Sequence, residues 1–487
     1  MSEFSSMLGS LIEEKGIKVY SMAKYCLLDR STMYKVINGT RKPPSMEAFH
    51  KMADFMRLTP MEYDMFLKAY EISILGKDVY YKRKNMENFM CGFPTAFSVP
   101  PLQLPEDFTV SAQIEREKKV PEFVTITNQT ELNHTIYHMF LAESEKPRGR
   151  IGMLLQPDRS FAFGLLAGQL STSRQLHIDH LVCLDHATRM TEEHESYTLM
   201  YLKNLLPLYA SSLDYHSYCF YDDIPSRYYN FSGTPFLILT EDFALTCCSD
   251  YSAGFFYGEK KAVGLLWSLF EDYKSKCDPL FRVLRTVEEE CEVFGAIDAV
   301  NAENYIIQPE PCLIPYIIRE MLEREIYQDI PERESFIEYL WSYIEGKGKA
   351  FPSKNTHMYN TKNGLLHFAA TGRLSEIPAE IYRPFAPEDR KELLLRLKED
   401  CGEYGFHLLK RPLAETPHDF HLWISDYYAF LFFSNVRKQN VYLDIREPGL
   451  LEDMMTFAAG IGEDQLYSQE ETEAYIQRLV DSIVEEE

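Results

Sequence analysis

Residues 27–45 read LLDRSTMYKVINGTRKPPS, and this stretch decides how the front of the chain folds. Asp29 can cap a helix that begins at Arg30, because a short acidic side chain accepts hydrogen bonds from the free backbone amides of a first helical turn. The Asn38-Gly39 pair tolerates the left-handed backbone that ends such a helix. The stretch therefore predicts a short helix over 30–37, followed by an exposed basic loop with two prolines.

This predicted helix has two different faces. Met33, Val36 and Ile37 recur at the spacing of one buried side. The opposite side carries cationic, polar and aromatic groups: Arg30, Ser31, Tyr34 and Lys35. We expect these groups to project into solvent.

Apolar residues on both sides of the stretch predict four more helices. The first ends at Gly16, and the second, over 19–26, contains Ala23, whose small side chain allows a close helix crossing. Ser45 can cap a fourth helix, and Pro60 can open a fifth. The pattern predicts an all-α head of five helices over residues 1–75.

The order of these elements resembles the lambda-repressor-like, Cro-type (Xre family) helix-turn-helix transcriptional regulators. The resemblance covers roughly residues 4–70 and rests on SMAKYC, a short turn, and DRSTMYKVINGTRKPPS. It implies a head that binds double-stranded DNA and places its third helix in the major groove. One departure is Val19, which stands where the family usually has a glutamine that contacts the DNA backbone.

The resemblance assigns roles to the exposed residues. Contacts to base edges carry sequence specificity, whereas contacts to phosphates fix the register of the protein on the duplex. The residues implied in base reading are Arg30, Ser31, Tyr34 and Lys35. Those implied in phosphate contacts are Tyr20, Lys24, Thr32, Asn38, Thr40, Arg41 and Lys42. The alternative interpretation is a basic face that is simply solvated.

Charge is unevenly distributed along the chain. The formal net charge is −24, yet residues 1–90 hold 14 Lys and Arg against 11 Asp and Glu. Residues 15–42 contain seven basic side chains and one acid, Asp29. Because an acidic body repels a polyanion, we expect the head alone to face DNA.

The rest of the chain predicts a large α/β or α+β body made of two tandem repeats of about 180 residues. ILTEDFALTCCSDYSAGFFYGEKKAVGLLWSLF, from Ile238, aligns without a gap with WISDYYAFLFFSNVRKQNVYLDIREPGLLEDMM, from Trp423. Upstream, the segments around EFVTITNQTE and NYIIQPEP correspond more loosely. We expect a connecting helix and proline-rich linker over 76–115, one repeat over 116–290, and a second over 291–487 that ends in an acidic helix.

Motifs for catalysis or metal binding are weak in the body. In LHIDHLVCLDH, His177 and Asp179 would share one face of a strand, whereas His180 would point to the other, and His186 could add a ligand from a loop. A hydrogen-bonded strand is the favoured interpretation, so we predict no metal. The sequence contains no P-loop, GxSxG or HExxH motif. We therefore expect neither an enzyme nor a cofactor.

Arg373, in TGRLSEIP, is the candidate effector residue of the body, because an arginine after a flexible Thr-Gly could clamp an anion. An arginine in a salt bridge is the alternative. A cleft between paired lobes could hold a small molecule or a protein effector within residues 116–487.

The sequence favours a cytoplasmic protein. No run approaches 18 apolar residues, and the N-terminus lacks the pattern of a secretory signal, so we expect no membrane partner. The ten cysteines are scattered, as expected for free thiols in a reducing compartment. The functional prediction is a homodimeric, sequence-specific transcriptional regulator, such as a repressor; the alternative is a protein-interaction module whose helix-turn-helix serves assembly.

Overall fold

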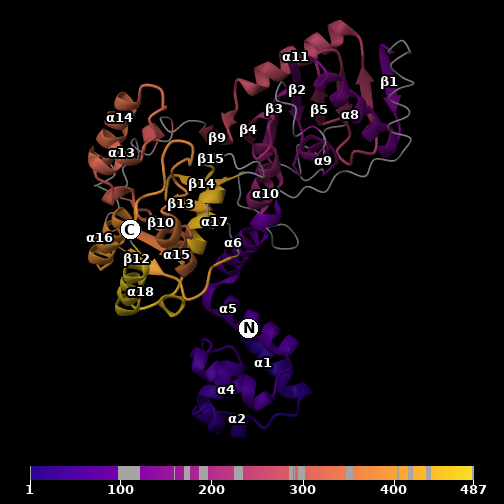
Figure 1. Ribbon diagram of the computed structural model, residues 1–487. Coiled ribbons are helices and arrows are strands. Elements are labelled where there is room, and N and C mark those ends of the chain that lie inside the picture. Colours follow the sequence, from indigo (N-terminus) through magenta and orange to yellow (C-terminus); the bar gives the residue numbers. More distant parts are fainter. Residues whose placement is uncertain are drawn as a thin grey trace. The chain divides into compact units, whose positions relative to one another are not determined.

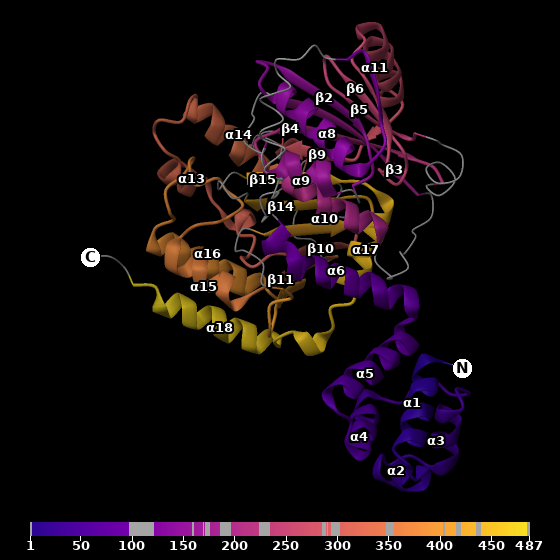
Figure 2. The same ribbon diagram turned by 90° about the vertical axis from the view of Figure 1, so that its right-hand side faces the viewer.

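The structure of this chain is a computed structural model, shown in two views in Figures 1 and 2. It describes residues 2–96, 121–157, 160–168, 170, 176–185, 196–223, 234–284, 289, 291–293, 302–346, 355–402, 405–414, 420–434 and 440–484. The chain divides into two compact units, Met1–Asn85 and Met86–Glu487. Most of the expected proline-rich linker, and His186, lie outside the described residues.

In the described residues of the first unit, every regular element is a helix. These helices are α1 (Glu3–Glu14), α2 (Val19–Tyr25), α3 (Arg30–Ile37), α4 (Met46–Met56), α5 (Pro60–Leu75) and the start of α6 (Lys77–Ala96). The boundary between the two units falls within α6. Gly16 and Gly39 have φ values of 61° and 69°, the left-handed backbone that ends the first and third helices.

The core of the first unit is an aromatic cluster surrounded by methionines. Phe4, Phe49 and Phe66 are almost completely buried, with ring centroids 4.9 Å apart for Phe4 and Phe66 and 4.8 Å apart for Phe49 and Phe66. The cluster joins α1, α4 and α5. Met22 and Met33 extend the same core to α2 and α3. Each helix therefore buries one side and leaves its polar side outward.

The first sheet of the second unit is mixed. Its strands are β1 (Phe123–Ile126), β2 (Gly149–Leu154), β3 (Leu176–Leu184), β4 (Asp214–Tyr221), β5 (Phe236–Leu239), β6 (Ala244–Cys247), β7 (Gly254–Tyr257) and β8 (Asp278–Pro279). Their order across the sheet is β1-β7-β6-β5-β2-β3-β4-β8. The central β2, β3 and β4 are parallel, and β5, β6 and β7 form an antiparallel meander beside β2.

The second sheet is also mixed. Its strands are β9 (Phe281–Leu284), β10 (Asn304–Ile307), β11 (Thr356–Asn360), β12 (Gly405–Leu408), β13 (His421–Ser425), β14 (Ala429–Ser434) and β15 (Asn440–Ile445). Their order is β12-β11-β10-β13-β14-β15-β9. Here β10, β11 and β12 are parallel, and β13, β14 and β15 form the meander. The chain passes from one sheet to the other between Pro279 and Phe281.

The two sheets have the same strand order when the second is read in reverse, as β9-β15-β14-β13-β10-β11-β12. In this comparison β1 to β7 of the first sheet correspond, in chain order, to β9 to β15 of the second, and β8 has no counterpart among the described strands. The gap-free alignment predicted from the sequence places β5, β6 and β7 on β13, β14 and β15. The looser upstream alignment is wrong. It sets β1 against β10, yet β1 is an edge strand paired with β7, whereas β10 is central and pairs with β11 and β13.

Helices cover both sheets, as Figures 1 and 2 show. Those that accompany the first sheet are α8 (Gln129–Ser144), α9 (Ser160–Gly168), α10 (Tyr197–Tyr209) and α11 (Lys260–Lys274). The later ones are α13 (Arg319–Glu325), α14 (Arg333–Gly346), α15 (Lys362–Thr371), α16 (Pro387–Asp400), α17 (Pro448–Ala458) and α18 (Gln469–Ser482), with short 3-10 turns at Ile314–Tyr316 and Glu463–Gln465. Among the described residues, no helix combines the length and the apolar character needed to cross a membrane.

Candidate nucleic-acid interface

The orientation of α3 is fixed by its cap and its buried side. The Asp29 carboxylate accepts a hydrogen bond from the Thr32 backbone amide at 2.8 Å. The hydrogen bonds from the Thr32 hydroxyl and from its backbone amide lower the pKa of Asp29, so the cap is charged at neutral pH. Met33 and Val36 are 0% and 2% exposed. With one face held in the core, the other face of α3 must point away from it.

The four residues predicted to read bases all lie on this outward face. Arg30, Ser31, Tyr34 and Lys35 are exposed. The guanidinium carbon of Arg30 lies 5.5 Å from the centre of the Tyr34 ring, so the cation and the aromatic group form one patch. An arginine at the start of a helix and a tyrosine one turn later can both reach the floor of a major groove.

Six of the seven predicted phosphate-contacting residues are exposed: Tyr20, Lys24, Asn38, Thr40, Arg41 and Lys42. Thr32 is half-buried, and its hydroxyl bonds to Asp29 and accepts a hydrogen bond from Arg41 Nη1 at 2.9 Å. The Thr40 hydroxyl donates to the Lys35 carbonyl at 3.1 Å. Thr32 and Thr40 therefore also hold the basic loop against α3.

The basic side chains of this surface form no direct ion pairs within the described part of the chain, although Asp29 lies near Arg41 and both bond to the Thr32 hydroxyl. Within the described part of the chain, no carboxylate lies at ion-pair distance from Lys24, Arg30, Lys35, Arg41 or Lys42. Some other cations of the first unit are paired, such as Lys15 with Glu62 at 2.9 Å and Lys51 with Glu47 at 2.6 Å, whereas Lys18, Arg57, Lys68 and Lys77 form no ion pair with a described residue either. The α3 side therefore carries exposed cations that form no ion pair with the described carboxylates.

The turn between α2 and α3 has a feature that the sequence did not indicate. Leu27 is 81% exposed and has a φ of 57°, a left-handed backbone that a leucine rarely adopts. The next amide, of Leu28, donates to the Ala23 carbonyl at 2.9 Å. Because leucine carries no signal for this conformation, the tight turn could be predicted but not its backbone strain.

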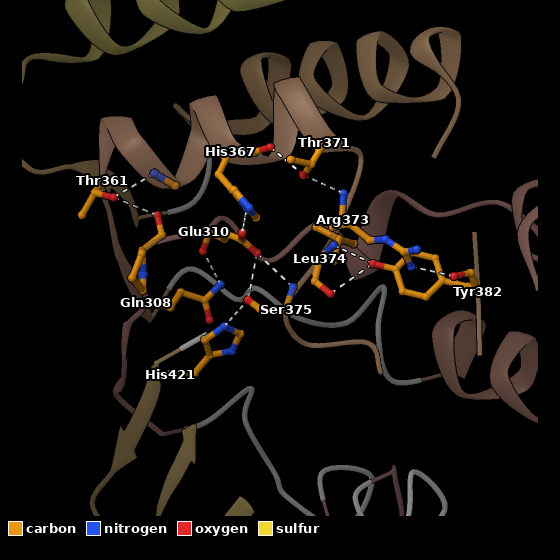
Figure 3. Close-up of polar contacts among 12 residues, drawn as sticks. Gln308, Glu310, Thr361, His367, Thr371, Arg373, Leu374, Ser375, Tyr382 and His421 are labelled. Atoms are coloured by element: carbon orange, nitrogen blue, oxygen red, sulfur yellow. Dashed lines mark hydrogen bonds and ion pairs between the residues drawn. The ribbon is translucent and has the colours of Figure 1, made fainter. Parts of the chain in front are cut away.

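Arg373, the candidate effector residue of the second unit, is engaged with its own loop (Figure 3). Its Nη1 donates to the Tyr382 carbonyl at 2.6 Å, and its guanidinium carbon lies 5.0 Å from the Tyr382 ring centre. Gly372 supplies the left-handed backbone before it, with a φ of 66°. The guanidinium therefore ties residues 373 and 382 together.

Next to this loop lies a polar network that sequence reasoning missed (Figure 3). Glu310 is 2% exposed, contacts His367, and accepts hydrogen bonds from the Ser375 amide and hydroxyl at 2.9 and 2.8 Å. The Ser375 hydroxyl also lies 2.9 Å from His421 Nε2. Burial lowers the pKa of His421 to about 3, so this imidazole is neutral at pH 7. The network joins the end of β10, helix α15 and the start of β13.

The strand that contains His177 and His180 divides these residues between two faces. His180 is buried, with Nδ1 2.6 Å from the Tyr215 hydroxyl and Nε2 3.0 Å from the Leu155 carbonyl. Burial lowers its pKa to about 4. His177 and Asp179 lie on the other face, where His177 Nε2 is 3.3 Å from Asp179 Oδ2.

Comparison with known proteins gives little for this chain. No family model matches it, and no curated protein matches it. One of the similar solved structures is that of the archaeal chromatin protein TrmBL2, which is described as showing a novel mode of DNA binding. The two sequences are 11% identical, the match covers 56% of this chain and 98% of that one, and the TM-score is 0.23. Another is phosphatidylserine synthase from Haemophilus influenzae Rd KW20, with 9% identity, coverage of 77% and 97%, and a TM-score of 0.21. At such scores neither likeness bears on fold or function.

Proposed function

We propose that this protein is a sequence-specific, double-stranded DNA-binding transcriptional regulator of the Cro-type (Xre family), in which the first unit binds DNA. The observation that carries the proposal is the surface of α3 and the following loop. It presents exposed cations that form no ion pair with a described residue, beside an exposed tyrosine, on a helix whose other face is buried in the core. Phosphates supply the missing negative charge, and base edges supply the contacts for the outward residues of α3.

The roles of the individual residues follow from their positions. Arg30, at the start of α3, would pair with a guanine, and Tyr34 would contact a thymine methyl group. Ser31 and Lys35 complete the reading face. The exposed residues Tyr20, Lys24, Asn38, Arg41 and Lys42 would contact phosphates, with Thr32 and Thr40 positioning the loop.

The second unit would regulate the first as a homodimerisation or effector-sensing body. The shared strand order of its two sheets supports an internal duplication, that is, two tandem copies of one α/β unit. A dimer would carry two heads, and their spacing must match two half-sites about one helical turn apart. An effector bound within residues 116–487, in a cytoplasmic protein, would act by changing that spacing.

The experiment is a binding assay with genomic fragments, followed by footprinting and titration of the selected site at several salt concentrations. Lys42→Ala is expected to weaken binding to all sequences and to reduce the slope of log K against log salt by about 1. Arg30→Ala is expected to cost about 1–3 kcal/mol and to relax the preference at one base pair.

Lys68→Ala is the matched control. It also removes one exposed lysine of the first unit, but this lysine lies on α5 and packs over the Tyr81 ring at 5.3 Å. Its affinity and salt slope should equal those of the wild type. Unchanged affinity in both Lys42→Ala and Arg30→Ala would show that the α3 surface is not the interface.

The second candidate is a protein-interaction module. It is favoured by exposed apolar and aromatic side chains around α2, since Tyr20, Tyr25 and Leu27 are 65%, 51% and 81% exposed. If the wild-type protein retains no DNA fragment at low salt, this candidate replaces the first.

A further inference from the structure

A cluster of two histidines and one aspartate stands at the start of β3 and β4 in the first sheet. His177 and Asp214 are register partners on these parallel strands, and His216 follows Asp214 by two residues and so points to the same face. His177 Nδ1 lies 2.7 Å from Asp214 Oδ2, and His216 Nε2 lies 2.9 Å from Asp214 Oδ1. The three ligand atoms lie within 4.8 Å of one another.

We propose that His177, Asp214 and His216 form a binding site for a divalent first-row transition metal ion such as Zn²⁺. Imidazole nitrogen and carboxylate oxygen are ligands that these ions take in proteins, and three protein ligands with an open fourth position make an accessible site. The side chains of His177, Asp214 and His216 are 36%, 43% and 41% exposed, so an ion and a water molecule can reach them.

A second layer of residues fixes the orientation of His177. Its other ring nitrogen, Nε2, lies 3.3 Å from Asp179 Oδ2. Asp179 is fully buried and is held by Arg150 Nη2 at 3.0 Å and by Lys274 Nζ at 2.7 Å. A carboxylate behind a ligating histidine sets the direction of the ring and is a recurrent feature of metal sites. Here it directs Nδ1 toward Asp214 and His216.

The second sheet offers an internal comparison at the corresponding strands, β11 and β12. His357 Nδ1 and His407 Nε2 lie 3.4 Å apart there, so a pair of histidines is present again. However, the register partner of His357 is Gly405, where the first sheet has Asp214. Glu303 contacts the other nitrogen of His357, at 3.4 Å, and so does not converge with the pair. We therefore place the metal in the first sheet alone.

The test is calorimetric titration of the full-length, chelator-treated protein with Zn²⁺, repeated with Co²⁺, whose visible absorption reports the ligand set. The wild type is expected to bind one tight equivalent of either ion per chain. Asp214→Asn and His216→Ala are expected to lose this equivalent. Asp179→Asn, which leaves the three ligands in place, is expected to weaken binding about 10- to 100-fold.

The control variants are His407→Ala, in the second sheet, and His138→Ala, from an α8 pair with Nε2 atoms 2.8 Å apart. Both should keep the tight equivalent. Asp214 and His216 are partly exposed, so circular dichroism should show wild-type folding in Asp214→Asn and His216→Ala, and the comparison with Asp179→Asn is made at a temperature at which that variant is folded. The proposal is overturned if the wild type binds no tight equivalent, if Asp214→Asn and His216→Ala bind like the wild type, or if a control variant abolishes binding. None of these outcomes depends on DNA binding.

Discussion

Glu376 should make the stability of the second unit depend on pH in a direction opposite to that of most carboxylates. Its side chain is 15% exposed, Oε1 accepts a hydrogen bond from Gln308 Nε2 at 3.2 Å, and Oε2 is buried without a hydrogen-bond partner among the described residues. Burial, together with a smaller effect of the neighbouring Glu310, raises the pKa of Glu376 to about 7, although hydrogen bonds from Cys312 and Gln308 act in the opposite direction. The folded state therefore holds this proton more tightly than the unfolded state does.

The direction and the size of the change in stability with pH follow from this difference in pKa between the folded and unfolded states. A carboxyl whose pKa rises from 4.5 to about 7 on folding loses stability as the pH rises through that window. At about 1.4 kcal/mol per pKa unit, the loss above pH 7 is on the order of 3 kcal/mol, an upper bound because the side chain keeps some contact with water. Glu376→Gln removes the charge and keeps the shape. This variant should therefore be more stable than the wild type at pH 8, with the difference falling below about 1 kcal/mol near pH 5.

The assay is urea unfolding followed by tryptophan fluorescence, because Trp267, Trp341 and Trp423, the three tryptophans of the chain, all belong to the second unit. The neutral, buried His421 destabilises the fold as the pH falls below 6.5, and its Nδ1 lies 3.8 Å from Glu376 Oε1. Because Glu376 is protonated in that pH range, His421 faces an uncharged neighbour in both proteins, and its effect largely cancels in their difference. Glu380→Gln, at an exposed position of the same segment, is the control and should differ little from the wild type at any pH. A Glu376→Gln difference that is flat with pH, or largest at pH 5, would refute the reasoning.

Three further substitutions test local features of both units. Leu27→Gly should stabilise the first unit by about 1 kcal/mol, since glycine adopts the left-handed turn without strain, and hydrogen exchange of the α2 and α3 amides should slow. Asp29→Ala should lower the stability of the first unit and speed exchange at the Thr32 amide, because the helix loses its cap; unchanged exchange would mean that the cap contributes nothing. Gly364→Ala should lower the free energy of unfolding in urea by about 1–3 kcal/mol or more, because the added Cβ would lie 1.8 Å from the Pro309 carbonyl oxygen. Wild-type stability would show that the backbone can move apart at this contact with little loss of free energy.

Local signals explain why many elements could be located from the sequence. The bounds of α3 follow from Asp29 at one end and Gly39 at the other, since both act within a single helical turn. The strands of the gap-free alignment could be located as well, because an apolar run between polar turns is itself a local signal. The exposure of the α3 surface follows in the same way from helical periodicity.

Pairings between distant segments could not be predicted in this way. A strand, a polar turn and a helix occur in any β-α unit, so the loose match of β1 with β10 had no power to distinguish an edge strand from a central one. The network of Glu310, Ser375 and His421 joins residues up to 111 positions apart, and no spacing within one segment reveals it. The same holds for His177 and Asp214, 37 residues apart, which only strand register brings together.

The two sheets show how such a pairing can be permitted in one place and excluded in another. At Gly405 an added Cβ would lie 2.4 Å from the Thr356 carbonyl oxygen and 3.2 Å from His357 Nδ1. The backbone contact is far too short for any side chain, so an aspartate cannot occupy this position unless the strand moves. At the corresponding position of the first sheet, Asp214 fits between two imidazoles. If the sheets descend from one duplicated unit, their histidine pairs are shared, and the close packing at Gly405 is the physical reason that the carboxylate is confined to the first.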